Sequence, residues 1–246
     1  MTISNNFPIS TINSETESPF TGFIREIQNQ YTNPYLMLDG SGQLVLNSVN
    51  YANRINFQKL VNYVNGLFAI YSRLIIIRLD LKYNAEFSPI TDLQQVQADR
   101  NHFLANMRHN SLFNDLAGYI WKLEEGEQGG YHYHFIFFYT NEHILNHSYY
   151  AEEIGKYWRG MVTKGRGSYF SGNQARYRKQ QLFPATGVVN YHDERNRFGL
   201  VNLLAYLCKD EQSLTNKPPK TRLVGTGQLP ELREVSLGRP RMYGCP

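Results

Sequence analysis

The sequence is poor in cysteine and has no long apolar run. Its 246 residues include two cysteines, Cys208 and Cys245, so neither a disulfide framework nor a paired-cysteine metal site is expected, and both thiols are predicted to be reduced. The apolar runs 74–77 and 135–138 are far shorter than the ~20 residues of a membrane helix. The first residues lack the basic and apolar parts of a secretory signal. We therefore expect a folded, cytoplasmic protein.

A strong overall charge is also missing, because the formal net charge is only +4. The basic excess lies in two segments, and residues 159–181 contain six basic residues and no acidic one. These basic residues are Arg159, Lys164, Arg166, Arg176, Arg178 and Lys179. Tyr169, Phe170 and Tyr177 are interleaved with them, a mixture typical of loops that contact nucleic-acid phosphates and stack on bases. The alternative interpretation is a solvated basic loop.

Composition and periodicity divide the chain into four parts. We expect a flexible tail over 1–20, an accessory helical segment over 21–70, a main domain over 71–212 and a basic tail over 213–246. Helical spacing of apolar residues predicts the accessory helix between 51 and 71. Within the main domain, the predicted order is strand 73–83, a helix from Thr91 or Asp92 to Asn110, strands 118–125 and 131–139, helix 151–162, strand 186–191 and helix 200–209.

This β-α-β-β-α-β order is typical of the ferredoxin-like, or split βαβ, arrangement. The fold class expected is therefore α+β, with an antiparallel sheet that carries its helices on one face. The turn between 125 and 131 contains the glycines that a hairpin needs.

Two histidines stand in the most apolar strand. Side chains alternate along a strand, so His132 and His134 share one face, and two imidazoles among apolar residues need a bound ion or polar partners. Glu124, Glu125 and Glu127 lie across the turn and could supply a carboxylate. Alternation favours Glu124, whereas Glu125 and Glu127 suit solvated turn positions. Two histidines and a carboxylate favour a divalent ion with open positions, and we expect Mg²⁺ or Mn²⁺, although two imidazoles also suit Zn²⁺. The alternative is a pair of histidines satisfied by hydrogen bonds alone.

The predicted helix 200–209 has a polar face opposite its leucines. Asn202, Tyr206 and Lys209 gather on that face at ~100° per residue. A cation beside a phenol favours the phenolate, which is the stronger nucleophile. Packing of Tyr206 against the fold is the alternative, and Tyr191 is the next tyrosine to consider.

The His-hydrophobic-His strand followed by a Tyr-x-x-Lys helix resembles the HUH endonucleases that initiate rolling-circle replication, and among them the inovirus-type (filamentous-phage-like) replication proteins. The similar segments are 122–126, 130–134, 157–158, 164–165 and 205–209. The resemblance implies that His132, His134 and Glu124 bind the metal, that Tyr206 is the single nucleophile and that Lys209 is the helix lysine.

The same resemblance implies the substrate and the partners. Single-stranded origin DNA would be nicked and rejoined through a 5′-phosphotyrosine, and a host polymerase and helicase would act on the product, since the chain has no P-loop of its own. No membrane partner is expected. Three alternatives remain: a single-tyrosine transposase, a DNA-binding relative without catalysis, and an HxH hydrolase, for which only His192 stands near a later strand.

Overall fold

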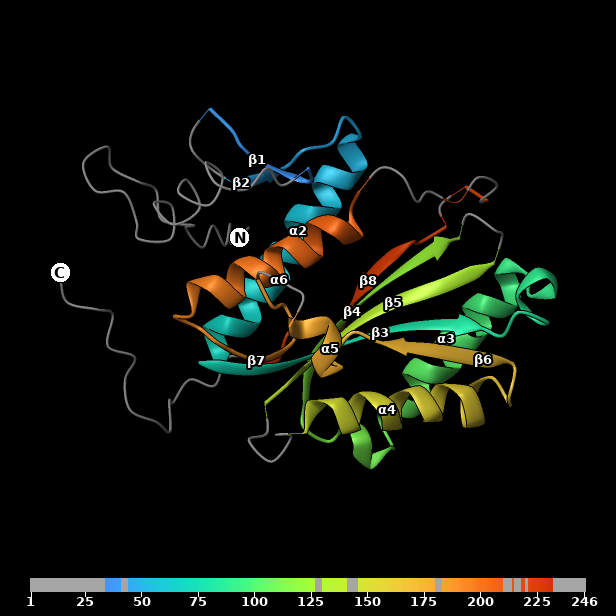
Figure 1. Cartoon of the computed structure of the whole chain (residues 1–246). Coiled ribbons are helices and arrows are strands. Elements are labelled where there is room, and N and C mark those ends of the chain that lie inside the picture. Colours follow the sequence, from blue (N-terminus) through green and yellow to red (C-terminus); the bar gives the residue numbers. More distant parts are fainter. Residues whose placement is uncertain are drawn as a thin grey trace, which may run out of the picture.

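Three long strands form the centre of the sheet in the computed structural model of the chain. The structure describes residues 34–40, 44–126, 130–140, 146–179, 183–209, 214, 218–219 and 221–231. Strand β5 (Tyr131–Tyr139) lies between β3 (Arg73–Tyr83) and β4 (Leu116–Glu125) and is antiparallel to both (Figure 1). The strands expected over 73–83 and 131–139 are confirmed, and β4 begins two residues before its expected start. The expected tail over 1–20, Glu127 and Cys245 lie outside the described residues.

Two short strands share the outer edge of β3. β6 (Gly167–Ser171) pairs with β3 over residues 79–83, and β7 (Gly187–Asn190) pairs with it over residues 73–76, both antiparallel. Asn173 fills the gap between them, because its side-chain oxygen accepts a hydrogen bond from the Arg78 amide at 2.7 Å and its nitrogen donates to the Ile76 carbonyl at 2.8 Å. The sequence predicted β7 and missed β6.

The other edge of the sheet is β8 (Val224–Thr226), which pairs with β4. This strand lies in the segment 213–246 that was expected to be a basic tail, so at least these residues belong to the sheet. A separate hairpin of β1 (Leu36–Leu38) and β2 (Leu44–Leu46) packs with α2 (Tyr51–Ile70). Among the described residues, no helix has the length and apolar character to cross a bilayer.

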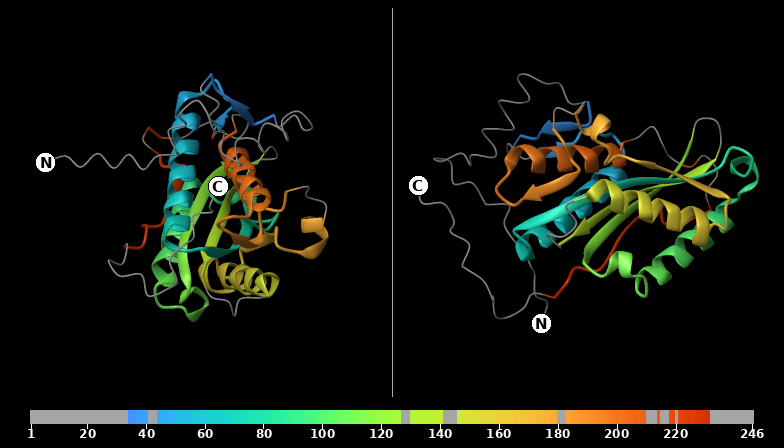
Figure 2. Two further views of the ribbon diagram at one scale, coloured as in Figure 1. Left: turned by 90° about the vertical axis from the view of Figure 1, so that its left-hand side faces the viewer. Right: turned by 60° about the horizontal axis from the view of Figure 1, so that its bottom comes forward.

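The helices cover both faces of the sheet, which corrects the expectation of helices on one face. α3 (Leu93–Met107) and α4 (His147–Tyr157), which continues as a π-helical turn over Trp158–Val162, cover one face. α2 and α6 (Glu194–Leu207) cover the other (Figures 1 and 2). The reason is that the central strands are apolar at successive positions, such as Ile75 and Ile76, so both of their faces must be removed from water.

The bounds of two helices differ from expectation at their starts. α6 was expected from residue 200 but begins at Glu194, because the Asp193 carboxylate caps it by accepting a hydrogen bond from the Asn196 amide. α4 begins four residues before its expected start, after the capping side chain of Asn146. α3 begins after Asp92, one of its two expected caps.

The α2/α6 face of the sheet changes from apolar to polar along the strands. Its apolar end packs under the two helices and contains Leu74, Ile76, Ile120, Ile136 and Phe138. Its polar end, on the same alternating positions, contains Arg78, Asp80, Lys122, Glu124, His132 and His134. The change occurs where α6 ends, because the Leu207 carbonyl accepts a hydrogen bond from Lys122 at 2.6 Å. α6 thus brings its last turn to the polar residues. α2 shares this core with β3, so the boundary expected at residue 70 does not separate two packed units.

Candidate metal centre

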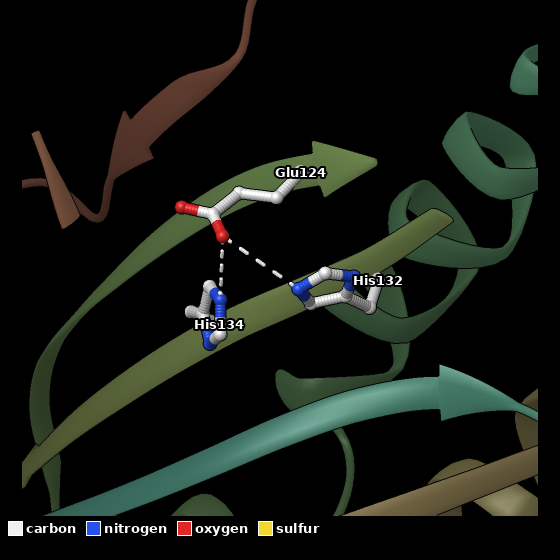
Figure 3. Close-up of side chains that lie close together, drawn as sticks. All are labelled: Glu124, His132 and His134. Carbon is white, nitrogen blue, oxygen red and sulfur yellow. Dashed lines mark hydrogen bonds and ion pairs between the residues drawn. The ribbon is translucent and has the colours of Figure 1, made fainter. Parts of the chain in front are cut away.

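Glu124, His132 and His134 converge on the polar end of the sheet. One possible ligand atom from each residue lies within 4.8 Å of those of the other two (Figure 3). One Glu124 oxygen, Oε2, lies 2.9 Å from Nε2 of His134 and 3.6 Å from Nε2 of His132. Glu124 has no exposed surface, and His134 is 4% exposed. This is a buried carboxylate between two imidazoles.

Strand pairing explains why these three residues meet. Glu124 on β4 is directly opposite His132 on β5, and residues that face each other across a ladder share one side of the sheet. His134 is two positions further along the same strand and therefore has the same orientation. Glu125 is opposite Tyr131 and belongs to the other side.

The donor set fits a divalent cation. Two imidazole nitrogens and one carboxylate oxygen are typical ligands of Mn²⁺, and Mg²⁺ could use the same carboxylate with waters in the remaining positions. Three protein ligands leave positions for substrate oxygens. His132, His134 and Glu124 would hold the ion.

Asp80 supports the centre from behind His134. Its Oδ1 lies 2.6 Å from Nδ1 of His134, so the imidazole is held between two carboxylates. A carboxylate on the far nitrogen of a metal-binding histidine fixes the tautomer and the ring orientation. Asp80 was missed in the sequence, although Arg78, Asp80 and Lys82 recur with period two in an otherwise apolar strand, and this spacing was the available signal.

The charges of this group are strongly coupled. Burial raises the pKa of Asp80, but the hydrogen bond with His134 and the charge of Arg78 outweigh it and lower the pKa to about 2. Burial likewise raises the pKa of Glu124, and the two histidines lower it to about 2. For His134, burial lowers the pKa, whereas the hydrogen bonds with Asp80 and Glu124 raise it above its ordinary value of 6.5. Without a metal, His134 is therefore favoured as a cation between two anions.

We expect the metal-free protein to lose stability as the pH rises above about 6.5. The stability contributed by His134 is fully present below its unfolded pKa of 6.5 and is lost as the pH rises through its higher folded value. The contributions of Asp80 and Glu124 are present above their ordinary values of 3.8 and 4.5 and are lost toward about 2. The melting temperature, measured with a chelator, should therefore be highest between about 4.5 and 6.5.

The matched variant for this measurement is His134→Gln. It removes the ionisable ring but keeps a polar side chain, so its melting temperature should fall less on the alkaline side. A melting temperature of the unaltered protein that stays level or rises above pH 6.5 would contradict the arrangement.

Tyr206 lies beside the centre. Its ring centroid is 6.2 Å from that of His134, and the side chain is half-buried in the last turn of α6. Two cations flank the ring, with Nζ of Lys209 at 4.6 Å and Cζ of Arg78 at 5.5 Å from its centroid. The ring of Tyr35 meets it edge-on at 6.0 Å. A phenol, two cations and a cluster of possible metal ligands thus occupy one site.

Lys122 contacts both the end of α6, the helix that carries Tyr206, and Glu124. It is 5% exposed, its Nζ donates to the Leu207 carbonyl, and the same atom is 3.8 Å from Oε1 of Glu124. The buried Lys122 side chain therefore links the end of α6 to the Glu124 carboxylate, one of the possible metal ligands, and fixes their relative positions. Cys208, in the same turn, is buried, and burial raises the pKa of its thiol to about 12, which leaves it a packing residue.

Over its described residues 159–179, the basic segment is mostly regular structure joined by two turns rather than one loop, which corrects that expectation. It contains the π-helical turn, β6 and α5 (Ala175–Lys179). Nη2 of Arg166 donates to both carboxylate oxygens of Asp99, and Arg178 donates to Nε2 of His147. The remaining four are exposed: Arg159, Lys164, Arg176 and Lys179.

Two of the segment's aromatic residues lie on the side of the metal centre. Phe170 on β6 is opposite Asp80 and therefore shares its face of the sheet. Tyr177 packs on Phe170 with ring centroids 4.8 Å apart, and Arg176 lies over the Tyr177 ring at 4.6 Å. By contrast, Tyr169 is on the opposite face, where its hydroxyl donates to Glu152.

Residues 43–219 match a known protein family, the YagK/YfjJ C-terminal domain. The match spans more than two thirds of the chain. The chain belongs to the YagK/YfjJ C-terminal domain family, a family of prophage-associated proteins. No match was found among curated proteins or among solved structures.

The YagK/YfjJ C-terminal domain contains the whole candidate centre. Its span includes the cluster, Asp80, Arg78 and the helix that carries Tyr206 and Lys209. Tyr35 lies before the matched residues and β8 lies after them, although both pack against elements within the domain.

Proposed function

We propose that this protein is a single-tyrosine HUH endonuclease that nicks and rejoins single-stranded DNA to initiate rolling-circle replication. The observation that carries the proposal is the position of Tyr206. Its ring centroid lies 6.2 Å from that of His134, which belongs to the only cluster of possible metal ligands among the described residues. The strand order β6-β3-β5-β4 and the connections through α3 and α4 also suit the ferredoxin-like sheet of that superfamily.

The proposed reaction is a phosphodiester transesterification. The phenol oxygen of Tyr206 attacks phosphorus, and the bond from phosphorus to the 3′ oxygen breaks. The phenol proton is lost to solvent and a proton from solvent completes the 3′ hydroxyl, so no further reactant is consumed. A bound Mg²⁺ or Mn²⁺ would neutralise charge on the phosphate oxygens. The reverse attack by the 3′ hydroxyl restores the strand and frees Tyr206.

The surroundings of the centre suit a DNA strand that crosses the sheet. Lys209 and the exposed cations of α5, Arg176 and Lys179, would contact phosphates, and Phe170 with Tyr177 would stack against a base. The product would be a 5′-phosphotyrosine and a 3′ hydroxyl for a host polymerase. This role is the one that the resemblance to inovirus-type replication initiators implies. A host helicase would act with the protein, and the reaction would take place in the bacterial cytoplasm.

The test is the formation of a covalent protein-DNA adduct. The protein is incubated with Mn²⁺ or Mg²⁺ and a labelled library of single-stranded oligonucleotides of random sequence, and the mixture is run on a denaturing gel. We expect labelled protein that depends on the metal, and sequencing of the trapped strands should give a common motif. Absence of an adduct with both metals and with the single strands of the surrounding genome would contradict the proposal.

A further inference from the structure

Arg78 lies beside Tyr206 and beside Asp80, the carboxylate that contacts His134. It is on β3, on the same face of the sheet as His134, at the position where that face changes from apolar to polar. Its side chain is 20% exposed, its Nε is 3.5 Å from Oδ1 of Asp80, and its Cζ is 5.5 Å from the centroid of the Tyr206 ring. Arg78 was not among the residues predicted from the sequence.

The fold alone does not account for this guanidinium. The backbone of Arg78 is held by Asn173, whose side chain accepts from its amide, so β3 does not need the side chain to keep its pairing. The Nε atom is buried and makes no hydrogen bond. Buried nitrogen donors in folded proteins are nearly always hydrogen-bonded, and a catalytic role or a bound ion is one explanation for an exception.

Asp80 connects this guanidinium to the metal centre. The same oxygen, Oδ1, lies 2.6 Å from Nδ1 of His134 and 3.5 Å from Nε of Arg78. One carboxylate therefore orients a metal ligand and an arginine together. The planar guanidinium can bind two phosphate oxygens at once, which an ammonium cannot do.

We propose that Arg78 is a catalytic residue that binds the scissile phosphate between the metal centre and Tyr206, with Asp80 as the positioning residue that keeps it there. This inference rests on the proposed function. A phosphate oxygen held by Arg78 would carry the negative charge that builds on phosphorus as the phenol oxygen attacks. Lys209, on the helix end beyond the ring, would contact the DNA backbone as a single point charge.

The first measurement is the rate of adduct formation at saturating DNA for Arg78→Gln and Arg78→Lys. We expect Arg78→Gln to lower this rate on the order of 10²–10³-fold, the usual effect of losing one donor to a transition-state oxygen. Arg78→Lys should recover part of it, since it keeps the charge without the two-pronged geometry. The control is Arg108→Gln, which removes an equal charge from an exposed position at the end of α3, on the other face.

The second measurement separates a phosphate contact from a structural role. Mn²⁺ affinity, from titration calorimetry without DNA, should be the same in Arg78→Gln and the control. Binding of single-stranded DNA to the metal-free protein should become less salt-dependent, with the slope of log affinity against log salt falling by about 0.7 for the one lost contact. A rate equal to that of the control, or a loss of Mn²⁺ affinity that accounts for the lower rate, would overturn the assignment.

The two proposals can fail separately. If the unaltered protein forms no adduct, the proposed nicking function fails, and the salt dependence of metal-free DNA binding still decides whether Arg78 contacts phosphate. If the adduct forms in Arg78→Gln as it does in Arg108→Gln, only the inference about Arg78 fails.

Discussion

Tyr206→Phe should abolish the covalent protein-DNA adduct while the protein stays folded. The substitution removes only the phenol oxygen, which is the proposed nucleophile, and the expected loss is at least ~10⁴-fold, as for nucleophile deletions in other covalent enzymes. The ring stays in place, so the contacts with His134, Arg78 and Lys209 are kept. The adduct is measured on a denaturing gel, and the melting temperature and Mn²⁺ affinity should match those of the unaltered protein.

Two tyrosines serve as matched controls for this experiment. Tyr35→Phe alters the ring that packs edge-on against Tyr206, and Tyr191→Phe alters a tyrosine that is 38% exposed and follows β7. Both variants should form the adduct. An adduct that persists in Tyr206→Phe and disappears in one of the controls would move the nucleophile to that residue, and persistence in all three would remove tyrosine from the mechanism.

The central strands could be predicted because their signal is local. β3 matches its expected bounds, and the hairpin of β4 and β5 follows from two runs of strand-forming residues around a glycine-rich turn. Period-two alternation, together with the resemblance to the HUH endonucleases, favoured Glu124 as the glutamate that faces the histidines, although the choice among the three glutamates stayed open. Glu124, rather than Glu125, is opposite His132.

The parts that were missed depend on contacts between distant segments. β6 is a five-residue strand of small and aromatic residues with no β-branched side chain, and it is held by its pairing with β3 rather than by its own pattern. The layer formed by α2 and α6 on the second face of the sheet was not predicted. Strands that are apolar at successive positions show that both faces are covered, but not which elements cover them. α2 was expected as an accessory element, yet it supplies half of that cover.

Arg78 and Asp80 show the same limit within the site. Their alternation along β3 was visible, but the register in which β5 pairs with β3 was not, and without that register no argument brought Asp80 to His134. The register Asp80 to His134 supplies that link, and the last turn of α6 then brings Tyr206 beside Arg78. A candidate pair of histidines and a candidate tyrosine could be predicted separately, whereas the two residues that connect them required the structure.

The double variant His132→Ala plus His134→Ala should remove both metal binding and nicking. It deletes two of three ligands, so Mn²⁺ affinity should fall by more than ~100-fold, the upper end of the loss from a missing support residue around a metal site. Metal-dependent adduct formation should disappear with it, because Glu124 alone cannot hold an ion beside the phosphate. Titration calorimetry measures the first effect and the denaturing gel measures the second.

His102→Ala plus His109→Ala is the control for the double variant. Both of these histidines are exposed at α3 and its end, on the opposite face of the sheet, so the control loses the same number of imidazoles without touching the centre. It should bind Mn²⁺ and form the adduct as the unaltered protein does. Adduct formation by His132→Ala plus His134→Ala at the control's rate would refute the metal assignment, because the phosphate would then be activated by Arg78 and Lys209 without an ion. Loss of Mn²⁺ affinity together with the adduct, in a variant that still melts cooperatively, is the result that a metal-dependent nickase requires.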